Sequence, residues 1–464
     1  MIKPFWMLGI DRSVQNIVGA GDYGFYFAIF NFSFLFNILL DFGITNFNNK
    51  NIAQNNHLLN KHFSSIIILK LLLAVVFGVL TFTFGLIVGY DSHQLGLLGW
   101  MVFNQFLISF ILYLRSNISG LLLFKTDSLV SVLDRLLMIA FCGTLLWGNV
   151  TTQKFQIEWF VYTQTAAYII TAIVALLIVI RKSAFTKLNW NIPFFILIIK
   201  QSFPFAILVL LMTFYNRIDS VMIERLLKGN IGDEQAGIYA SAYRLLDATN
   251  MIAYLFSVLL LPIFAKMLKS KEEVVHLVQL SFKLLFTIAI VIAAGSFFYN
   301  KEIMSMLYTN HVEASAAVFQ WLMMGFIAIS TTYVFGTLLT ANGNLKELNI
   351  IAASGMLINI SLNLILIPKL MALGSAYVSV TTQFLTSIVQ VIFAQRIFKF
   401  KVNYRFLSTL VIFVIGVISI NIFSKHFIVD NWHYNFVGMV ILSIVLAGFL
   451  KLLNFKSLIA TIRS

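Results

Sequence analysis

The chain consists of a series of apolar runs, each about as long as a bilayer is thick, joined by short polar connections. A bilayer core of about 30 Å requires about 20 apolar residues in a helix, and continuous rather than alternating runs favour helices over half-buried strands. We therefore expect an all-α polytopic membrane protein with about 14 transmembrane helices. Residues 1–18 carry an incomplete run, and complete runs fall at 24–45, 63–89, 95–114, 129–148, 158–180, 193–221, 236–266, 277–299, 317–341, 348–367, 372–398, 406–424 and 435–453.

Lysine and arginine are unevenly distributed among the connections, and this predicts the orientation of the chain. With residue 1 placed inside, 18 of these residues fall in inner connections and 6 in outer ones. Cytoplasmic connections are enriched in lysine and arginine, so we expect a multi-pass membrane protein with both termini in the cytoplasm. The net charge of +14 also fits a second interpretation, which is an anionic substrate.

An internal repeat relates the two halves of the sequence. Residues 19–26 and 232–239 share the pattern G-x4-G-[FI]-Y at an offset of 213, and a Lys-Leu-Leu triplet at Lys70 recurs at Lys283 with the same offset. A later match between Gly120 and Gly336 has an offset of 216. Three matches in order indicate duplication of a six-span unit, and an even number of spans gives a parallel repeat.

This repeat predicts the organisation of the chain. We expect an N-terminal lobe at 1–190 with spans 1–6, a C-terminal lobe at 191–400 with spans 7–12, and spans 13–14 with a cytoplasmic tail at 401–464. Aligning Arg12 with Asp219 places residue 1 near position 208 of the second lobe. The first span is therefore expected to lack about four turns.

Several charged residues fall within or at the edge of the apolar runs, where an unpaired charge is costly. Basic side chains in a cavity would attract an anion, and arginine matches phosphate oxygens bidentately. The alternatives are lysines that extend to the interface and ion pairs between helices. The candidates for binding a diphosphate or an anionic sugar are Arg12, Arg217, Arg244, Arg115, Lys70 and Lys283, and the candidates for ion coupling or ion pairing are Asp41, Asp219, Asp247, Asp134 and Arg135.

The sequence carries no recognisable catalytic or metal-binding motif. It has no HExxH pattern, no P-loop and no GxSxG, the arrangements that would indicate common hydrolases or nucleotide-binding enzymes. A single cysteine, Cys142, excludes an internal disulfide. We therefore expect a protein that is not an enzyme and that has no metal site.

Residues 214–262 resemble the start of the second lobe in the polysaccharide flippases, the O-antigen-type branch of the MOP superfamily, which also contains the MATE exporters and the lipid II flippases. Residues 21–44 and 341–379 support this resemblance, the latter through its asparagines and a Leu-Ile-Pro turn. The resemblance extends over nearly the whole chain, and its motifs are distributed rather than concentrated in one signature.

The resemblance implies a flippase that moves an undecaprenyl-diphosphate-linked oligosaccharide across the inner membrane by alternating access, for O-antigen, lipopolysaccharide or other surface polysaccharide biosynthesis. It also implies cavity cations that meet the diphosphate. Apart from the resemblance, we expect H⁺ or Na⁺ as the coupling ion, no other cofactor, and a monomer. The expected partners are the lipid-linked substrate, membrane lipids and polysaccharide assembly proteins such as a polymerase or chain-length regulator, and not nucleic acid. Two alternatives remain: a MATE-like cation-coupled exporter of drugs or metabolites, and an integral-membrane polysaccharide polymerase or transferase.

Overall fold

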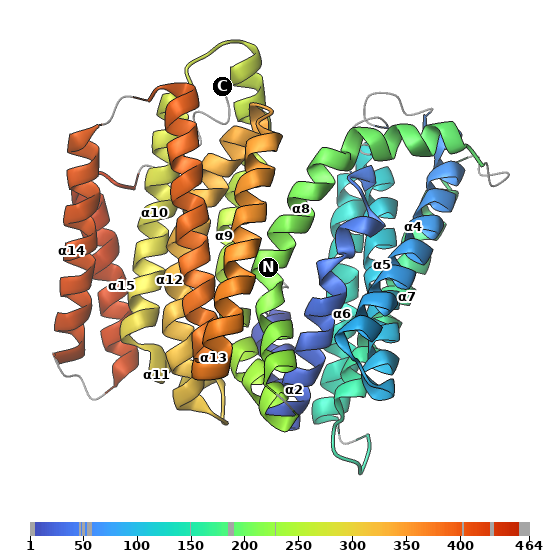
Figure 1. The fold of residues 1–464 in the computed structure, drawn as a ribbon, viewed down its shortest axis with the longest axis horizontal. Helices are drawn as coiled ribbons and strands as arrows, with labels where there is room; N and C mark the ends of the chain where they lie inside the picture. The colour runs from blue at the N-terminus through green and yellow to red at the C-terminus, as the bar shows by residue number, and fades with distance from the viewer. Residues whose placement is uncertain are drawn as a thin grey trace. The chain divides into compact units, whose positions relative to one another are not determined.

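The computed structural model describes residues 5–45, 48, 52, 58–148, 150–183, 190–227, 229–400, 403–426 and 431–453. Over these residues the chain is helical and contains no strand (Figure 1). The elements are η1 (Trp6–Asp11), α2 (Arg12–Leu35), η2 (Asn37–Leu40), α4 (Leu58–Val88), α5 (Ser92–Gly120), α6 (Phe124–Trp147), α7 (Ile157–Ile180), α8 (Ile192–Leu226), α9 (Asn230–Lys269), α10 (Val275–Phe298), α11 (Asn300–Leu307), α12 (Val312–Ala341), α13 (Leu345–Phe398), α14 (Tyr404–His426) and α15 (Trp432–Phe449).

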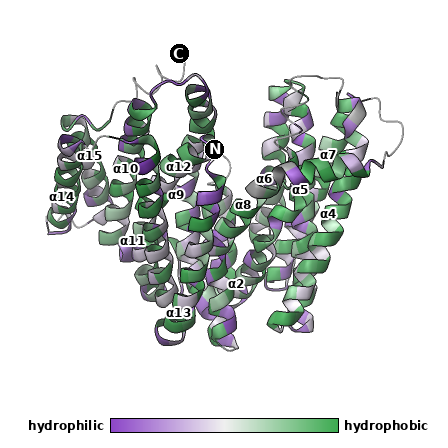
Figure 2. Cartoon of the chain, turned by 45° about the horizontal axis from the view of Figure 1, so that its top comes forward, coloured by the Kyte–Doolittle hydropathy of each residue, from purple (hydrophilic) through white to green (hydrophobic). Residues whose placement is uncertain are grey.

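The predicted spans correspond closely to these helices. Among the described residues, 11 helices are long and apolar enough to cross a membrane. The long helix α13 contains two predicted spans, because the backbone at Met371 adopts φ 54° and ψ −137° and interrupts the helix there. The polytopic all-α architecture is confirmed, and Figure 2 shows that hydrophobic residues predominate along the long helices. The short helix α11 was not expected from the sequence.

The chain divides by its internal contacts into two compact units, Met1–Gly237 and Ile238–Ser464. The first unit includes α8, which packs against α2, and the start of α9. The lobes expected at 1–190, 191–400 and 401–464 stay a prediction. In the first unit, α5 packs against α7, α2 and α4, and α6 packs against α7. In the second unit, α12 is central and packs against α10 and α13, while α14 and α15 pair and contact α10.

The chain reverses direction at Gly19, inside the segment α2. The hydroxyl of Tyr23 donates to Oδ1 of Asp11 at 2.8 Å, although residues 12 positions apart in a straight helix would be about 18 Å apart. Gly19 has φ 89° and ψ 171°, a conformation that glycine adopts without a steric penalty. Residues 5–18 therefore form a short first arm and residues 20–35 a second.

An aromatic and ionic cluster connects α14 and α15 to the rest of the second unit. The Tyr299 hydroxyl contacts Ser424, Lys425 lies 4.9 Å from the Tyr299 ring centroid, and Lys425 pairs with Glu302. The ring of Tyr299 also meets Phe436 edge-on at 5.3 Å. These contacts fix one end of the α14–α15 hairpin to α10 and α11.

Candidate functional site

The two copies of the glycine motif meet at one end of the first unit. A Cβ added to Gly24 would lie 1.8 Å from the carbonyl oxygen of Asp233, and one added to Gly237 would lie 1.9 Å from that of Ala20. Because 20 and 24 differ from 233 and 237 by the repeat offset of 213, each contact is the counterpart of the other. Small residues allow such close helix approach. We call this contact the glycine crossing; it holds the α2 and α9 backbones together.

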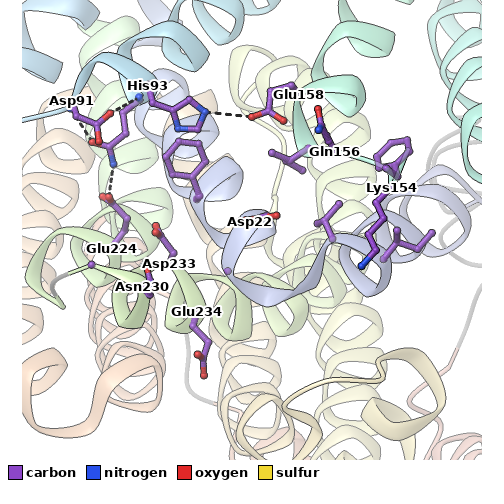
Figure 3. Close-up of a pocket in the computed structure, with 18 of the residues that line it drawn as sticks. Asp22, Asp91, His93, Lys154, Gln156, Glu158, Glu224, Asn230, Asp233 and Glu234 are labelled. Carbon is purple, nitrogen blue, oxygen red and sulfur yellow. Dashed lines mark hydrogen bonds and ion pairs between the residues drawn. The ribbon is translucent and has the colours of Figure 1, made fainter. Parts of the chain in front are cut away.

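A polar cleft of about 1520 Å³ lies beside the glycine crossing (Figure 3). It is larger than the roughly 300–1,000 Å³ of usual small-molecule pockets. Its walls come from the α2 turn, the α4–α5 and α6–α7 connections and the start of α9. Six carboxylates and two basic side chains line it, together with amides, aromatic rings and His93. The lining residues that bear on its chemistry are Asp22, Phe25, Asp91, His93, Gln94, Gln153, Lys154, Phe155, Gln156, Glu158, Glu224, Arg225, Asn230, Asp233 and Glu234.

One wall of the cleft is fixed by a capping interaction at the start of α5. The Asp91 carboxylate accepts from the backbone N–H of Gln94 at 2.8 Å, and the Gln94 side chain accepts from the Asp91 N–H at 3.1 Å. This reciprocal capping box satisfies two backbone donors. The Gln94 amide also donates to Glu224 Oε1 of α8 at 2.8 Å, so the capped helix start positions the Glu224 carboxylate.

His93 connects α2, α5 and α7 across the cleft. Its Nε2 lies 3.3 Å from Glu158 Oε1, as the dashed line in Figure 3 shows. Its ring stacks on Phe25 at 5.0 Å between centroids. Lys154 lies on the opposite side of the cleft from Glu224 (Figure 3).

Arg225 forms the boundary between this cleft and an apolar groove. Its guanidinium pairs with Glu224 through Nε and Nη2, donates to the Gly89 carbonyl at 3.2 Å, and lies 4.6 Å from the Tyr90 ring centroid. Burial, with the nearby Glu224 carboxylate, raises the pKa of the Tyr90 phenol. The ring therefore stays neutral at physiological pH and remains a favourable cation–π partner for Arg225.

The chemistry of the cleft is that of a hydrogen-bonding surface with an excess of negative charge. Carboxylates only accept hydrogen bonds, whereas amides both donate and accept. Together they can bind a polyhydroxylated ligand, and the carboxylate excess also favours a cation. Within the described part of the chain, no group of three or more His, Cys, Asp or Glu side chains could hold a metal ion.

None of the six predicted substrate-binding residues lines the cleft, and two of them form structural ion pairs. Lys70 is 1% exposed, and its Nζ lies 2.5 Å from Asp41 Oδ1, 2.9 Å from the Leu40 carbonyl and 2.9 Å from Ser109 Oγ. These three acceptors compensate the charge of the Lys70 ammonium group inside the first unit, so Lys70 does not extend to the membrane interface. Arg115 makes two hydrogen bonds to Asp127, at 2.8 and 3.2 Å.

The other two predicted arginines of the first unit lie elsewhere on it. Arg217 lies 5.3 Å from the Phe34 ring centroid. Arg12 is half-buried, and its Nε makes no hydrogen bond with any described residue. The predicted residues Arg244 and Lys283 belong to the second unit and are half-buried on α9 and α10.

The predicted acidic residues and Arg135 also lie outside the cleft. Arg135 Nε is 3.7 Å from Asp134 Oδ2, and its guanidinium lies 5.9 Å from the Trp6 ring centroid. Asp219 is fully buried on α8, and Asp247 is half-buried on α9. The structure thus brings together Asp41 with Lys70 and Asp134 with Arg135. A role for any of these residues in ion coupling stays a prediction.

The cleft residues were not identified from the sequence. Asp91 and Gln94 have the spacing of a capping box, which predicts the start of a helix. Because an apolar run follows them, this helix start would lie at a membrane interface. In the sequence, Arg225 is one basic residue of an expected outer connection, and nothing else distinguishes it. The sequence gives no indication that four separate connections converge on one cleft.

Comparison with known proteins assigns the family. A model of the family described as polysaccharide biosynthesis protein matches residues 13–268, more than half of the chain. The chain belongs to this family. A second family model, MatE, matches residues 204–365, and no curated protein matches the chain in sequence.

Solved structures show which fold this family member adopts. A lipid II flippase, MurJ, in an inward closed conformation superimposes with a TM-score of 0.72 at 15% identity, covering 99% of this chain and 98% of that one. An inward-facing multidrug resistance MATE transporter gives 0.66 at 12% identity, covering 85% and 94%. A MOP superfamily transporter from Pyrococcus furiosus gives 0.60 at 13% identity, covering 86% and 92%. The fold is that of MOP-superfamily transporters and flippases.

Proposed function

We propose that the protein is a flippase for an undecaprenyl-diphosphate-linked oligosaccharide and works by alternating access. The observation that carries this proposal is the match to the polysaccharide biosynthesis family over residues 13–268. The polar cleft supports it, because its amides, carboxylates and aromatic rings suit the hydroxyl groups of an oligosaccharide.

Further features of the proposal rest on the sequence. The glycan is destined for a surface polysaccharide such as O-antigen or lipopolysaccharide, and the protein resides in the cell inner membrane with cytoplasmic termini. The protein is a monomer without enzymatic activity, with H⁺ or Na⁺ as its coupling ion. It works beside a polymerase or chain-length regulator.

One observation favours a second candidate, a MATE-like exporter of cationic compounds. The polar cleft carries six carboxylates against two basic side chains among its described lining residues, and such a cleft concentrates cations rather than anions. The MatE match at residues 204–365 agrees with this candidate as well.

A deletion strain separates the two candidates. The flippase proposal predicts that loss of the gene removes surface polysaccharide and leaves susceptibility to cationic drugs unchanged, and that the intact gene restores the polysaccharide. Arg217→Ala and Arg244→Ala should each reduce the restored amount if these side chains meet the diphosphate. Unchanged polysaccharide with raised drug susceptibility would instead establish the exporter.

A further inference from the structure

The first part of α8 lies across one end of the first unit. The helix has 35 residues, or about 52 Å, whereas the bilayer core of about 30 Å needs only about 20 residues. Figure 1 shows the start of α8 lying across the ends of other helices of this unit, and the rest of α8 running down toward α2. We call residues 192–203 the lateral segment.

The sequence marks both ends of the lateral segment. The Asn191 side chain accepts from the backbone N–H of Phe194 at 3.1 Å and so caps the helix. Pro193 lies in the first turn, where a missing N–H costs no intrahelical hydrogen bond. Pro204 follows the segment, and a proline inside a helix removes a hydrogen bond and bends the helix.

One side of the lateral segment is buried against helix ends. Phe195 and Ile198 are 5% and 1% exposed, and they belong to one apolar cluster with Leu59, Phe63 and Val179. Leu59 is the second residue of α4, and Val179 is the second-to-last residue of α7. Because the spans end at this level, the lateral segment lies at the boundary between membrane and water.

The other side of the lateral segment exposes an apolar stripe beside a lysine. Ile192, Ile196 and Phe203 are 52%, 59% and 52% exposed, and at about 100° per residue they lie within about 40° of one another around the helix. Lys200 is exposed and lies about one turn from both Ile196 and Phe203. This pattern is typical of a helix that lies in the plane of the interface.

The sequence around the lateral segment is basic. Residues 181–205 contain no Asp or Glu and four basic residues, Arg181, Lys182, Lys187 and Lys200. Arg181 and Lys182 directly follow α7 and are exposed. Trp190 is 58% exposed and meets the Phe195 ring edge-on at 6.1 Å, and tryptophan is enriched at membrane–water interfaces. The charge therefore complements an anionic membrane surface.

We propose that the lateral segment is a binding surface for anionic phospholipid. The stripe of Ile192, Ile196 and Phe203 enters the upper acyl region, and the Lys200 ammonium group contacts the headgroup phosphate. The lysine and arginine distribution predicts that this end of the unit is cytoplasmic, where anionic lipids create a negative surface potential. This inference goes beyond the proposed function and does not depend on which solute the protein moves.

The charge, rather than the apolar stripe, makes this surface selective. Every phospholipid offers acyl chains, so the stripe does not distinguish one headgroup from another. One basic residue near an anionic surface contributes enough attraction for about fivefold enrichment. This attraction weakens when salt shortens the screening length. A salt-sensitive preference for anionic over zwitterionic lipid is therefore the expected signature.

Photocrosslinking tests this surface. Ile196 is replaced by p-benzoylphenylalanine in the full chain, which is placed in nanodiscs with equal amounts of phosphatidylglycerol and phosphatidylcholine. Val75 of α4 is the matched position, since it is 64% exposed near the middle of a span. We expect about fivefold more labelling by phosphatidylglycerol than by phosphatidylcholine at position 196, and equal labelling by the two lipids at position 75.

Substituting the lysine tests the role of the charge. Lys200→Gln should bring the two yields at position 196 to within about twofold of each other, and raising the salt concentration should lower the native ratio. Lys200 is exposed, so its substitution should not disturb the fold. Lys154→Gln is the control, because Lys154 precedes α7 and lies at the opposite end of that helix from Val179. It should leave the ratio unchanged.

Three outcomes would overturn the proposal. Equal labelling by the two lipids at position 196 would remove the headgroup preference. The absence of any lipid labelling there would show that the stripe contacts water or protein instead. A ratio that persists in both Lys200→Gln and high salt would show that charge does not select the lipid. The flippase proposal is tested separately by the deletion strain.

Discussion

The surroundings of Lys70 show that its charge has a structural role. Its Nζ reaches a carboxylate, a backbone carbonyl and a hydroxyl, all within 2.9 Å. Three acceptors match the three donors of an ammonium group. The cost of burying the charge is thus offset locally, and the side chain connects η2 and α5 to α4.

We predict that Lys70→Met destabilises the protein by about 1–3 kcal/mol, because the buried Leu40 carbonyl and Ser109 hydroxyl lose a donor. Asp41 also loses its partner, but it is 27% exposed and keeps its hydrogen bonds from Thr45. The measurement is the thermal unfolding midpoint of the purified protein in detergent. Asp41→Asn should lower the midpoint too, and the double variant should lower it by less than the two single effects added together.

Lys283→Met is the matched control for this prediction. Lys283 is the repeat counterpart of Lys70 but is only half-buried, and the structure records no ion pair for it among the described residues. Its substitution should change the midpoint little. Equal effects of the two substitutions would show that the contacts of Lys70 contribute nothing specific.

At the residue scale, the sequence shows which charges lie in apolar runs but not which residues they pair with. Lys70 and Asp41 are 29 positions apart, and their pairing depends on how η2 lies against α4. Arg115 and Asp127 are closer, at 12 positions, but they lie on different helices across the α5–α6 connection. Hydrophobic periodicity indicates which side chains share a face of one helix. The members of each pair lie on different elements, so periodicity could not predict either pair.

At the scale of elements, the glycine crossing explains the second glycine of the repeated G-x4-G motif. That glycine is Gly24 in one copy and Gly237 in the other, and a side chain at either position would collide with the facing backbone. The motif itself was visible in the sequence. Its consequence was not, because the two copies are 213 residues apart and their mutual contact depends on the packing of α2 against α8 and α9. The reversal at Gly19 was expected only as a gap between two apolar runs.

We predict that Gly24→Ala and Gly237→Ala each lower the unfolding midpoint and the restored polysaccharide. A Cβ at either position would lie within 2 Å of a backbone oxygen, so the helices must move apart. Gly96→Ala is the control, since nothing lies within 4 Å of its added Cβ and Gly96 does not line the polar cleft. A normal midpoint in the Gly24 and Gly237 variants would contradict the close approach.

The α14–α15 hairpin provides a second prediction at this scale. Glu302→Gln should weaken its attachment to α11 by removing the partner of Lys425, and the result should be faster hydrogen exchange at the end of α14. Glu313→Gln is the control, because the Lys301–Glu313 pair is 68% and 87% exposed and such pairs contribute little. Equal exchange in both variants would exclude a role for Glu302.

At the scale of the whole molecule, the sequence predicted the class, the spans and the family with few errors. These properties follow from apolar run length and from distributed motifs, which are local signals. The polar cleft instead forms where connections that are far apart in the sequence meet in the folded chain. Its acidic lining differs from the basic cavity that the net charge suggested.

The most direct test of the central claim is translocation by the purified full chain in proteoliposomes. Undecaprenyl-diphosphate-linked oligosaccharide is incorporated in both leaflets, and a lectin added outside measures how much glycan becomes accessible over time. We predict that the protein raises the accessible fraction well above that of empty vesicles, and that ethidium loaded as a cationic drug is not moved. Ethidium movement with no change in lectin-accessible glycan would contradict the account.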